Sequence, residues 1–203
     1  MMTRTEIINS LIYEYNYKSY LEIGVNTPSQ PGYNWIGVKI PLKHGVDPNV
    51  ETTFKMTSDE FFKNHIAQKY DIIFIDGLHL FEQVYKDIIN SLLYLNDNGT
   101  IVVHDCNPLE EITQRRIRAS DAWHGDVWKA ILKLRTEEKD LEIFTIDTDE
   151  GCGLIRRGRQ ELLVVDKDID KYNFSYLQKN RQNILNLISI NVFKQKFLKI
   201  NRL

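Results

Sequence analysis

The feature that most constrains this chain is a strand–helix–strand pattern within residues 71–108. The apolar run Ile72–Ile75 is rich in β-branched side chains and ends at Asp76, which is typical of a strand buried on both faces. Apolar residues then recur at steps of three and four from Phe81 to Leu95, which predicts a helix. A second β-rich run, Thr100–Val103, completes a βαβ crossover, so the two strands are predicted to be parallel.

The ends of these two predicted strands carry the most chemically active side chains. Asp76 and His79 follow the first strand, and His104 and Asp105 follow the second. In open parallel sheets, ligands bind beyond the carboxyl ends of the strands. Asn and Gly readily adopt the left-handed conformation past a helix end, so residues 96–99 (Asn-Asp-Asn-Gly) are predicted to stop the intervening helix.

Length and composition restrict the classes of protein that this chain can represent. Its 203 residues suit one α/β domain, predicted at residues 1–160, with a helical extension at 161–203. A net charge of −2 argues against a nucleic-acid partner. Two cysteines do not make a disulfide framework, which favours a reducing, cytoplasmic location. No apolar run is long enough to span a membrane, and the N-terminus lacks the apolar core of a signal peptide.

The rest of the chain continues the alternation of strands and helices. Thr3 and Glu6 predict a capping box at the start of a helix over residues 3–17. Ser58 is predicted to cap a helix that carries Ile66 inward, and Asp126 is predicted to cap a later one. The remaining predictions are strands at 19–25, within 33–46, at 141–146 and at 153–155, a long loop at 109–123, and a helix at 175–200. The result is a mostly parallel sheet with an antiparallel edge.

Acidic residues at the first and second strand ends favour a nucleoside ligand. Glu22 precedes a tight turn at Gly24, where a glycine allows close approach of a ligand. Asp47 ends the presumed second strand, where an acid can accept both ribose hydroxyls. A nicotinamide-dependent dehydrogenase is the alternative. It is disfavoured because the G-x-G-x-x-G fingerprint is missing and prolines at 28 and 31 interrupt any immediate helix.

Seven short motifs in order resemble a known family. LEIGV, GVDPN, TSDEFF, FIDGLH, GTIVVHDCNP, GDVWKAI and DTDEGCG are similar to segments of class I S-adenosylmethionine-dependent methyltransferases. The resemblance runs from about Tyr20 to Ile155, and it is to the bacterial branch of sugar and macrolide O-methyltransferases and, more distantly, to catechol O-methyltransferase. It implies a Rossmann-like α/β fold, with a seven-stranded, mostly parallel sheet whose last strand is antiparallel and helices on both faces.

The resemblance also implies roles for individual residues. Those that would border the S-adenosylmethionine cofactor are Glu22 and Gly24 (methionine part), Asp47 (ribose), Ser58 and Asp59 (adenine, at the end of the third strand) and Asp76 (sulfonium). His79 lies where catechol-type members have the lysine that deprotonates the acceptor, so it is the expected general base. Asp105, the second catalytic candidate, and Asp76 match acids that bind a divalent cation such as Mg²⁺ in metal-dependent members.

The chain departs from the family pattern at two places. Cys106 stands where relatives carry Asp or Asn, so Asn107 or a water would have to complete a magnesium site. Thr27-Pro28 replaces a second glycine in the first loop. The predicted function is O-methylation of a hydroxyl on a sugar, glycan precursor or other small molecule. The alternative is a degraded methyltransferase fold that binds cofactor or a partner without turnover.

Several residues have a structural interpretation beside the functional one. His104 is expected to point into the core, bonded to a backbone carbonyl, and Cys106 to be a small buried residue. Trp123 or His124 could line an acceptor pocket, and the arginines at 115, 116 and 118 could meet an anionic or sugar substrate or form a solvated face. The basic, apolar end of the C-terminal helix predicts a homodimer surface or a solvated edge.

Overall fold

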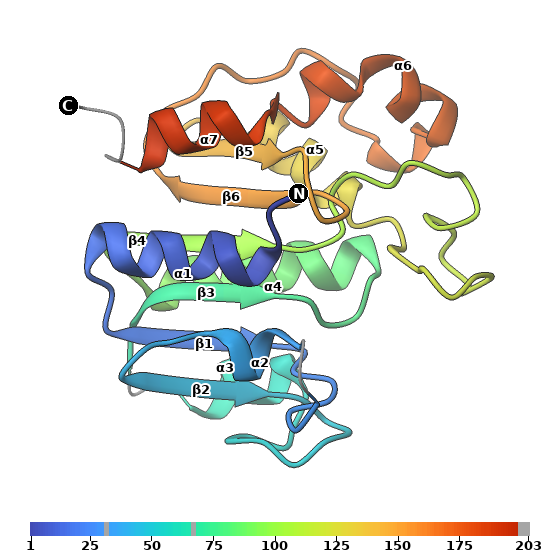
Figure 1. Cartoon of the computed structure of the whole chain (residues 1–203). Coiled ribbons are helices and arrows are strands. Elements are labelled where there is room, and N and C mark those ends of the chain that lie inside the picture. Colours follow the sequence, from blue (N-terminus) through green and yellow to red (C-terminus); the bar gives the residue numbers. More distant parts are fainter. Residues whose placement is uncertain (31–32, 66–67, 199–203) are drawn as a thin grey trace.

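Seven strands form one sheet in the computed structural model, which describes residues 1–30, 33–65 and 68–198. The strand order is β2-β1-β3-β4-β6-β5-β7 (Figure 1). The strands are β1 (Ser19–Ile23), β2 (Leu42–Val46), β3 (Tyr70–Ile75), β4 (Leu95–Val103), β5 (Leu141–Ile146), β6 (Cys152–Arg157) and β7 (Leu187–Ile188). The helices are α1 (Arg4–Tyr15), α2 (Asn34–Gly37), α3 (Ser58–Asn64), α4 (Phe81–Tyr94), α5 (Trp128–Glu137), α6 (Phe174–Ile184) and α7 (Ile190–Phe197), with a short 3₁₀ turn at Ile169–Lys171.

The strand pairing confirms the predicted fold class, although the antiparallel strand is β6, inside the sheet, rather than the last strand at its edge. Strands β1 to β4 pair in parallel, and β6 runs antiparallel between β4 and β5. The predicted βαβ unit is β3-α4-β4, and β3 and β4 are parallel neighbours. Because the carboxyl ends of β1, β2, β3 and β4 lie at one edge of the sheet, the loops that follow them meet there (Figure 1).

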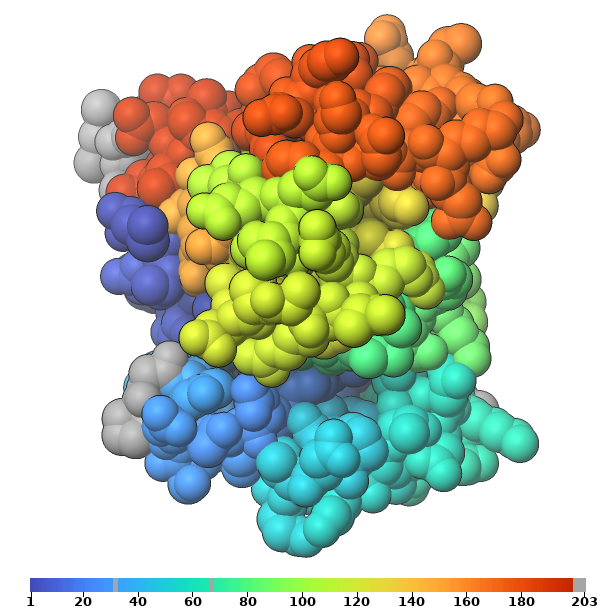
Figure 2. Space-filling model, turned by 90° about the vertical axis from the view of Figure 1, so that its right-hand side faces the viewer, coloured from blue at the N-terminus to red at the C-terminus, as the bar shows by residue number. Residues whose placement is uncertain are grey.

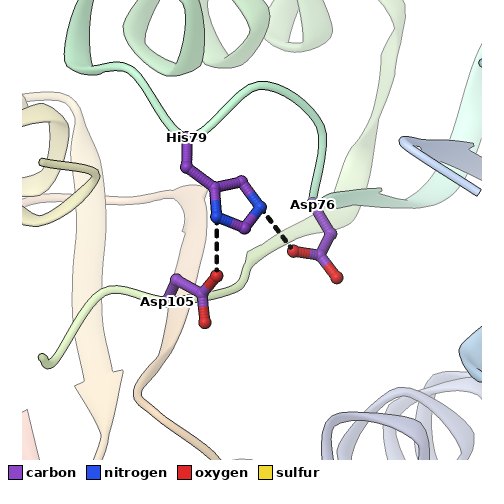
Figure 3. Close-up of side chains that lie close together, drawn as sticks. All are labelled: Asp76, His79 and Asp105. Atoms are coloured by element: carbon purple, nitrogen blue, oxygen red, sulfur yellow. Dashed lines mark ion pairs between the residues drawn. The ribbon is translucent and has the colours of Figure 1, made fainter. Parts of the chain in front are cut away.

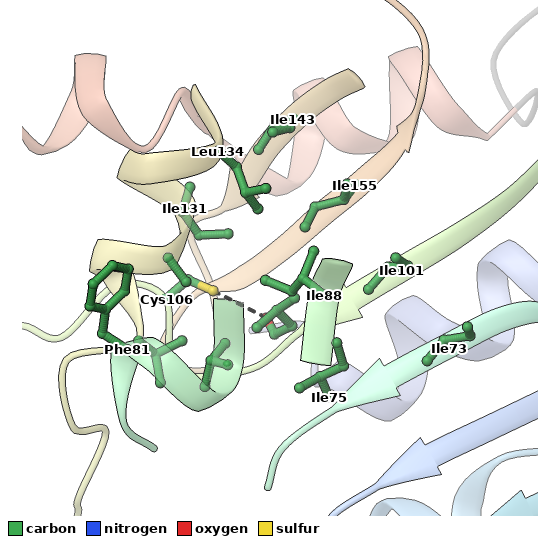
Figure 4. Packing of buried hydrophobic residues seen from close by; sticks show 14 of the residues in the cluster. Ile73, Ile75, Phe81, Ile88, Ile101, Cys106, Ile131, Leu134, Ile143 and Ile155 are labelled. Carbon is green, nitrogen blue, oxygen red and sulfur yellow. Dashed lines mark hydrogen bonds between the residues drawn. The ribbon is translucent and has the colours of Figure 1, made fainter. Parts of the chain in front are cut away.

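The alternation of side chains along β3 fills two cores. Ile73 and Ile75 pack on the face covered by α3, α4 and α5 (Figure 4), while Ile72 and Phe74 pack on the opposite face with α1 and α7. All four side chains are almost fully buried. A strand buried on both faces reads as a continuous apolar run, which explains why this segment was recognisable in the sequence.

The helix of the βαβ unit ends differently from the prediction. Helix α4 stops at Tyr94, and Leu95 is already in extended conformation (φ −84°, ψ 133°) as the first residue of β4. No residue from 96 to 99 has a positive φ, so the predicted left-handed stop is wrong. Leu95 is buried as expected, but as a strand residue paired with Tyr70. The tertiary pairing therefore overrides the local turn signal.

Two predicted helix caps are wrong, and one is confirmed. Thr57, rather than Ser58, caps α3, because its hydroxyl accepts from the backbone N–H of Glu60 in a capping box. Asp126 does not cap α5; its Oδ1 accepts from the backbone N–H of Phe81 at 2.8 Å, at the start of α4. The Thr3–Glu6 capping box of α1 is present as predicted.

Other boundaries also differ from the predictions. The first strand ends at Ile23 rather than Val25, and the ambiguous 33–46 segment divides into helix α2 and strand β2. The predicted third strand is reduced to one bridge between Val46 and Phe54. Loop residues 31–32 and the predicted inward residue Ile66 lie outside the described residues. Among the described helices, none combines the length and apolar character needed to cross a membrane.

The C-terminal segment is two helices rather than the single predicted helix at 175–200. Strand β7 separates α6 from α7 and pairs in parallel with β5, so this segment extends the main sheet. Phe193 is fully buried in the core shared with α1. Residues 199–200 lie outside the described part. The domain boundary at residue 160 and the homodimer through the C-terminal helices stay predictions.

Candidate active site

A cavity of ≈ 690 Å³ opens at the carboxyl-terminal edge of the sheet. Viewed from that edge, the surface is hollowed between the segment around residues 109–124 and the segments that surround β2 (Figure 2). All eight residues selected from the sequence line this cavity: Glu22, Gly24, Asp47, Ser58, Asp59, Asp76, His79 and Asp105. The fold therefore brings together side chains that are up to 83 positions apart in the sequence.

Three of these residues form a compact group (Figure 3). His79 Nε2 lies 3.4 Å from Asp76 Oδ1, and His79 Nδ1 lies 3.1 Å from Asp105 Oδ2. Asp76 follows β3 and Asp105 follows β4, so the pairing of these two strands fixes the separation of their carboxylates. His79 lies in the loop between β3 and α4, with its ring between the two acids.

The His79 ring is further fixed by the loop that covers the cavity. Its Nδ1 lies 2.7 Å from the carbonyl oxygen of Trp123, and the two aromatic rings stack with centroids 5.1 Å apart. Since a carbonyl only accepts, Nδ1 carries a hydrogen. Nε2 is then the nitrogen available to a ligand. The proposed lining role of Trp123 is therefore supported, while His124 is buried behind the wall against Thr113.

Asp105 is held in an uncommon backbone conformation. Its φ is +61°, in the left-handed region that a non-glycine residue adopts only at an energetic cost. The preceding N–H of His104 still bonds to Ile75 O, and the following N–H of Cys106 bonds to Gly151 O. The two neighbouring backbone contacts thus hold the turn that directs the Asp105 carboxylate at His79.

His104 contradicts its predicted structural role. It is buried as expected, but its Nδ1 lies 3.0 Å from Asp105 Oδ1 and 3.4 Å from Asp76 Oδ1, and its side chain bonds to no backbone carbonyl of a described residue. Its Nε2 faces Asp149 Oδ1 at 3.6 Å. The prediction failed because alternation along β4 indicates only on which face a side chain lies, whereas the partners Asp76 and Asp149 come from two other loops.

Sequence reasoning missed two members of this cluster, Arg4 and Asp149. Arg4 opens α1 and lines the cavity, where its Nη1 lies 3.3 Å from Asp149 Oδ1. Asp149 belongs to the tight β5–β6 turn, in which residues 149, 150 and 151 all have positive φ. Asp149 could have been found from the DTDEGCG motif, which contains it. For Arg4, the sequence indicates only a position at the start of a helix.

The charged groups of this cluster shift one another's pKa. Burial alone would lower the pKa of His79 and His104, but the adjacent carboxylates outweigh it and raise both, that of His104 strongly. Burial would raise the pKa of Asp76, but His104 and His79 lower it far below its usual range. The pKa of Asp149 falls to about 2 because His104 and Arg4 outweigh its burial. The cluster is therefore a set of ion pairs at neutral pH.

Glu22 has the opposite electrostatic environment. Burial raises the pKa of its carboxyl to about 8, and the charge of Asp76 adds to this effect. Its Oε2 accepts from the Tyr20 hydroxyl at 2.7 Å and from Asn34 Nδ2 at 3.4 Å. Because Glu22 is protonated in this environment, a cation that binds beside it would have to displace its proton.

Gly24 is required for a reason that differs from the prediction. Its φ is +85°, and a Cβ at this position would lie 2.2 Å from the backbone oxygen of Asp76. The glycine therefore lets the loop after β1 pack against the loop after β3. The close approach that Gly24 allows is therefore between two backbone segments of the protein, rather than between the protein and a ligand.

Asp47 already shapes the loops around the cavity. Its Oδ2 accepts from the backbone N–H of Asn26 at 3.0 Å, and Oδ1 accepts from Asn49 and Val50. A carboxylate has about four acceptor positions, so it retains capacity for ligand hydroxyls. Asp47 thus has a structural role, and its contact with a ribose stays a prediction.

The predicted adenine end contains a polar cluster on α3 and α4. Gln83 Nε2 donates to Ser58 Oγ, Asp59 Oδ1 and Asp87 Oδ1, at 3.0–3.2 Å. Asp59 also pairs with Lys86 at 2.6 Å and is partly exposed. Asp87, which sequence reasoning missed, is buried in the cavity wall, and burial raises its pKa to about 6.

The cluster of Asp76, His79 and Asp105 fits a divalent cation only in part. One ligand atom of each lies within 4.8 Å of the others. Mg²⁺ and Ca²⁺ prefer six or more oxygen ligands, so waters or substrate oxygens would have to supply the remainder. Asn107 cannot supply a further metal ligand as the sequence suggested, because its amide is bonded to Asp147 and Arg181 outside the cavity. Cys106 lies in the core as expected, and burial raises the pKa of its thiol.

The matched family model supplies the decisive comparison. Residues 19–106 match a family described as "Methyltransferase domain". This segment contains β1 to β4 and all eight selected site residues. This segment of the chain is similar to a methyltransferase domain. No curated protein matches the chain by sequence.

Solved structures share the fold of this chain. A candidate caffeoyl-CoA O-methyltransferase from Staphylococcus aureus has a TM-score of 0.57 at 18% identity, with 76% of this chain and 82% of that chain covered. TomG from Streptomyces achromogenes, solved with S-adenosylmethionine, gives 0.55 at 14%, covering 76% and 79%. An O-methyltransferase from Bacillus cereus, solved with S-adenosylhomocysteine, gives 0.51 at 14%, covering 75% and 78%.

Proposed function

We propose that this methyltransferase transfers the methyl group of S-adenosylmethionine to a hydroxyl of a small molecule, such as a sugar or glycan precursor. One observation carries the proposal: a single cavity joins the acids expected to bind a nucleoside, Glu22 and Asp47, to a histidine held between two carboxylates. Its volume of ≈ 690 Å³ is within the range of small-molecule sites. The O-methyltransferases of similar fold support the reaction type.

The donor would lie along the carboxyl ends of the first strands. Asp47 would accept the ribose hydroxyls, and Ser58 with Asp59 would lie beside the adenine. Asp76, with its pKa lowered by two histidines, remains a carboxylate and would face the positive sulfonium. The low-dielectric cavity strengthens this attraction.

His79 would act as the general base toward the acceptor hydroxyl. Its Nδ1–H is fixed by Trp123 O and Asp105, which leaves Nε2 directed into the cavity beside Asp76. The neighbouring acids raise the pKa of His79 despite its burial, which favours the protonated ring before the donor binds. The positive charge of the donor beside Asp76 would offset that carboxylate and lower the pKa of His79 toward its usual value. A neutral imidazole could then accept the hydroxyl proton.

Asp105 would orient the acceptor from the other side of His79. It is almost fully buried, and its left-handed backbone fixes its direction. If Mg²⁺ binds, the carboxylates of Asp76 and Asp105 would hold it, and it would polarise the acceptor oxygen. Otherwise the same carboxylate would accept a hydrogen bond from a second hydroxyl of the acceptor.

The acceptor would enter between the 109–124 segment and the loop after β3. Trp123 and the half-exposed Leu78 provide an apolar wall beside His79, against which the carbon skeleton of a ring would pack. Transfer would occur by in-line displacement, with the acceptor oxygen opposite the sulfur of the donor. Most of the rate enhancement would come from holding these atoms in line and near contact.

Calorimetry and a transfer assay test the proposal. S-adenosylhomocysteine is titrated into the purified protein with and without Mg²⁺, and methyl transfer from labelled S-adenosylmethionine is then measured with nucleotide sugars and simple phenols. We expect micromolar binding and transfer to a hydroxyl. Failure of S-adenosylhomocysteine to bind in both conditions would reject the proposal. Tight binding without transfer to any acceptor class would favour a binding protein on a methyltransferase fold.

A further inference from the structure

Arg118 brings a guanidinium to the cavity from the segment at residues 109–124. This segment forms one side of the hollow at the carboxyl-terminal edge of the sheet (Figure 2). Arg118 lines the cavity together with Trp123, whose ring stacks on His79. The backbone between Arg118 and Trp123 spans at most about 18 Å, so one small molecule can reach both side chains.

The Arg118 guanidinium is held by carbonyls of its own loop. Nε donates to Ser120 O at 3.3 Å, and Nη2 donates to Asp121 O at 2.9 Å. These bonds fix the direction of the guanidinium before a ligand binds, which lowers the entropy cost of a contact with it. The side chain is exposed, and its Nη1 makes no hydrogen bond to a described residue. Nη1 is therefore an accessible donor in the cavity wall.

The positive charge of Arg118 is not matched by an acid. No described carboxylate forms an ion pair with it, whereas Arg4, the other arginine that lines the cavity, pairs with Asp149 at 3.3 Å. Arg116, two positions before Arg118, pairs with two acids outside the cavity wall. Of the two arginines in the wall, Arg118 is therefore the one whose charge is left for a ligand.

The backbone of the same loop has a surplus of hydrogen-bond donors. The carbonyl oxygens of residues 115, 120, 121, 122 and 123 all accept from side chains, among them the Trp123 indole and the His79 ring. By contrast, no backbone N–H from 114 to 123 donates to a described residue. With its acceptors occupied and its donors free, the loop favours an anion, which accepts from N–H groups and from a guanidinium.

We propose that Arg118 forms an anion subsite for the acceptor, so that the substrate is a sugar bearing a phosphate or a carboxylate group rather than a neutral sugar. The inference rests on the proposed function, and it adds the charge of the acceptor. The sugar ring packs against Trp123, its hydroxyl meets His79, and the anionic group reaches Arg118. Because Asp76 and Asp105 repel an anion at the strand ends, the anionic group is directed toward the loop.

The test compares matched sugars on the complex with S-adenosylhomocysteine. Calorimetry measures the binding of glucose, glucose 1-phosphate, uridine diphosphate glucose and glucuronate to this complex, for the wild-type protein and for Arg118→Met. The control is Arg115→Met, which removes an exposed guanidinium of the same loop that lies outside the cavity wall and pairs with no described acid. The affinity for S-adenosylhomocysteine and thermal melting check that each variant keeps the donor site and the fold.

We expect the wild-type complex to bind an anionic sugar about tenfold or more tightly than glucose, and Arg118→Met to remove most of this preference. Arg115→Met should keep the preference. Arg118→Lys, which keeps the charge but not the planar guanidinium, should retain part of it and serves if Arg118→Met does not fold. Preference for the two phosphorylated sugars identifies a phosphate as the anion, and preference for glucuronate identifies a carboxylate.

Two results would overturn the inference. One is that the wild-type complex binds no anionic sugar more tightly than glucose, and the other is that the preference survives unchanged in Arg118→Met. Both leave the proposed function intact as long as S-adenosylhomocysteine binds and the methyl group is transferred to a hydroxyl. Absence of S-adenosylhomocysteine binding to the wild-type protein would instead reject the proposed function, and the inference with it.

Discussion

His79 Nδ1 lies 3.1 Å from Asp105 Oδ2, although the two residues follow different strands and are 26 positions apart. The same ring stacks on Trp123 and faces Asp76 through its other nitrogen. Contacts on both edges and one face leave the imidazole a single orientation. This rigidity is what a base or a metal ligand requires, and it leads to the first two predictions.

Replacing His79 with Ala should lower turnover by about 10²- to 10⁴-fold, the usual contribution of a general base. The affinity for S-adenosylhomocysteine should change little, because the residues assigned to the donor are retained. Single-turnover methyl transfer and calorimetry provide the two measurements. His44→Ala is a suitable control, since His44 bonds to Tyr70 away from the cavity. Unchanged turnover in His79→Ala would remove His79 from the mechanism.

Asp76→Asn and Asp105→Asn should each remove any dependence of the reaction on Mg²⁺. Both changes delete a charged oxygen ligand from the three-residue cluster. Turnover and S-adenosylhomocysteine affinity are measured across a Mg²⁺ titration after treatment with EDTA. Asp59→Asn, at the adenine end, should retain any Mg²⁺ effect. A Mg²⁺ effect that survives in both cluster variants would place the ion elsewhere.

Binding of S-adenosylhomocysteine at pH 7 should release a proton from Glu22. With a pKa of about 8, the Glu22 carboxyl is protonated before binding, and a ligand ammonium group would favour the carboxylate. Calorimetry in buffers with different ionisation enthalpies measures the number of protons released. Glu22→Gln should abolish the release, whereas Glu82→Gln, at an exposed position, should not. Identical release from Glu22→Gln would assign the proton to another group.

Glu22 should also make the unliganded protein less stable as pH rises. Its pKa is about 8 when folded and about 4.3 when unfolded. Between these values the folded state binds more protons than the unfolded state, so the free energy of unfolding decreases as pH rises, and it levels off above about 8. Urea unfolding of the wild-type protein and Glu22→Gln from pH 5 to 9 isolates this contribution. The difference between the two proteins should shift in favour of Glu22→Gln over this range, and a constant difference would contradict the prediction.

Gly24→Ala should destabilise the fold by at least about 2 kcal/mol, since it combines a positive φ with a steric clash. The new Cβ would lie 2.2 Å from Asp76 O. Gly77→Ala is the matched control: its Cβ would lie 3.5 Å from the nearest neighbour, the Ile23 side chain, and its φ is not positive. Urea unfolding of both variants measures the difference. Equal loss of stability in the two would show that the loop after β1 relaxes.

The βαβ unit around β3 and β4 could be predicted from the amino-acid pattern alone, because a strand buried on both faces leaves a continuous apolar run that needs no tertiary information to recognise. The same pattern indicated which acids lie at the strand ends, since parallel strands bring their carboxyl ends to one edge. All eight selected residues line the same cavity for this reason.

The partners of those residues became visible only in the three-dimensional structure. His104, which was expected in the core, pairs with Asp76 and Asp105. Arg4 reaches the cavity from the first turn of the N-terminal helix α1. The end of α4 was likewise set by pairing of Leu95 with Tyr70 against a local turn signal. Periodicity and caps are local properties of the backbone, whereas the contacts of a buried charge depend on which distant loops the packing brings within a few ångströms.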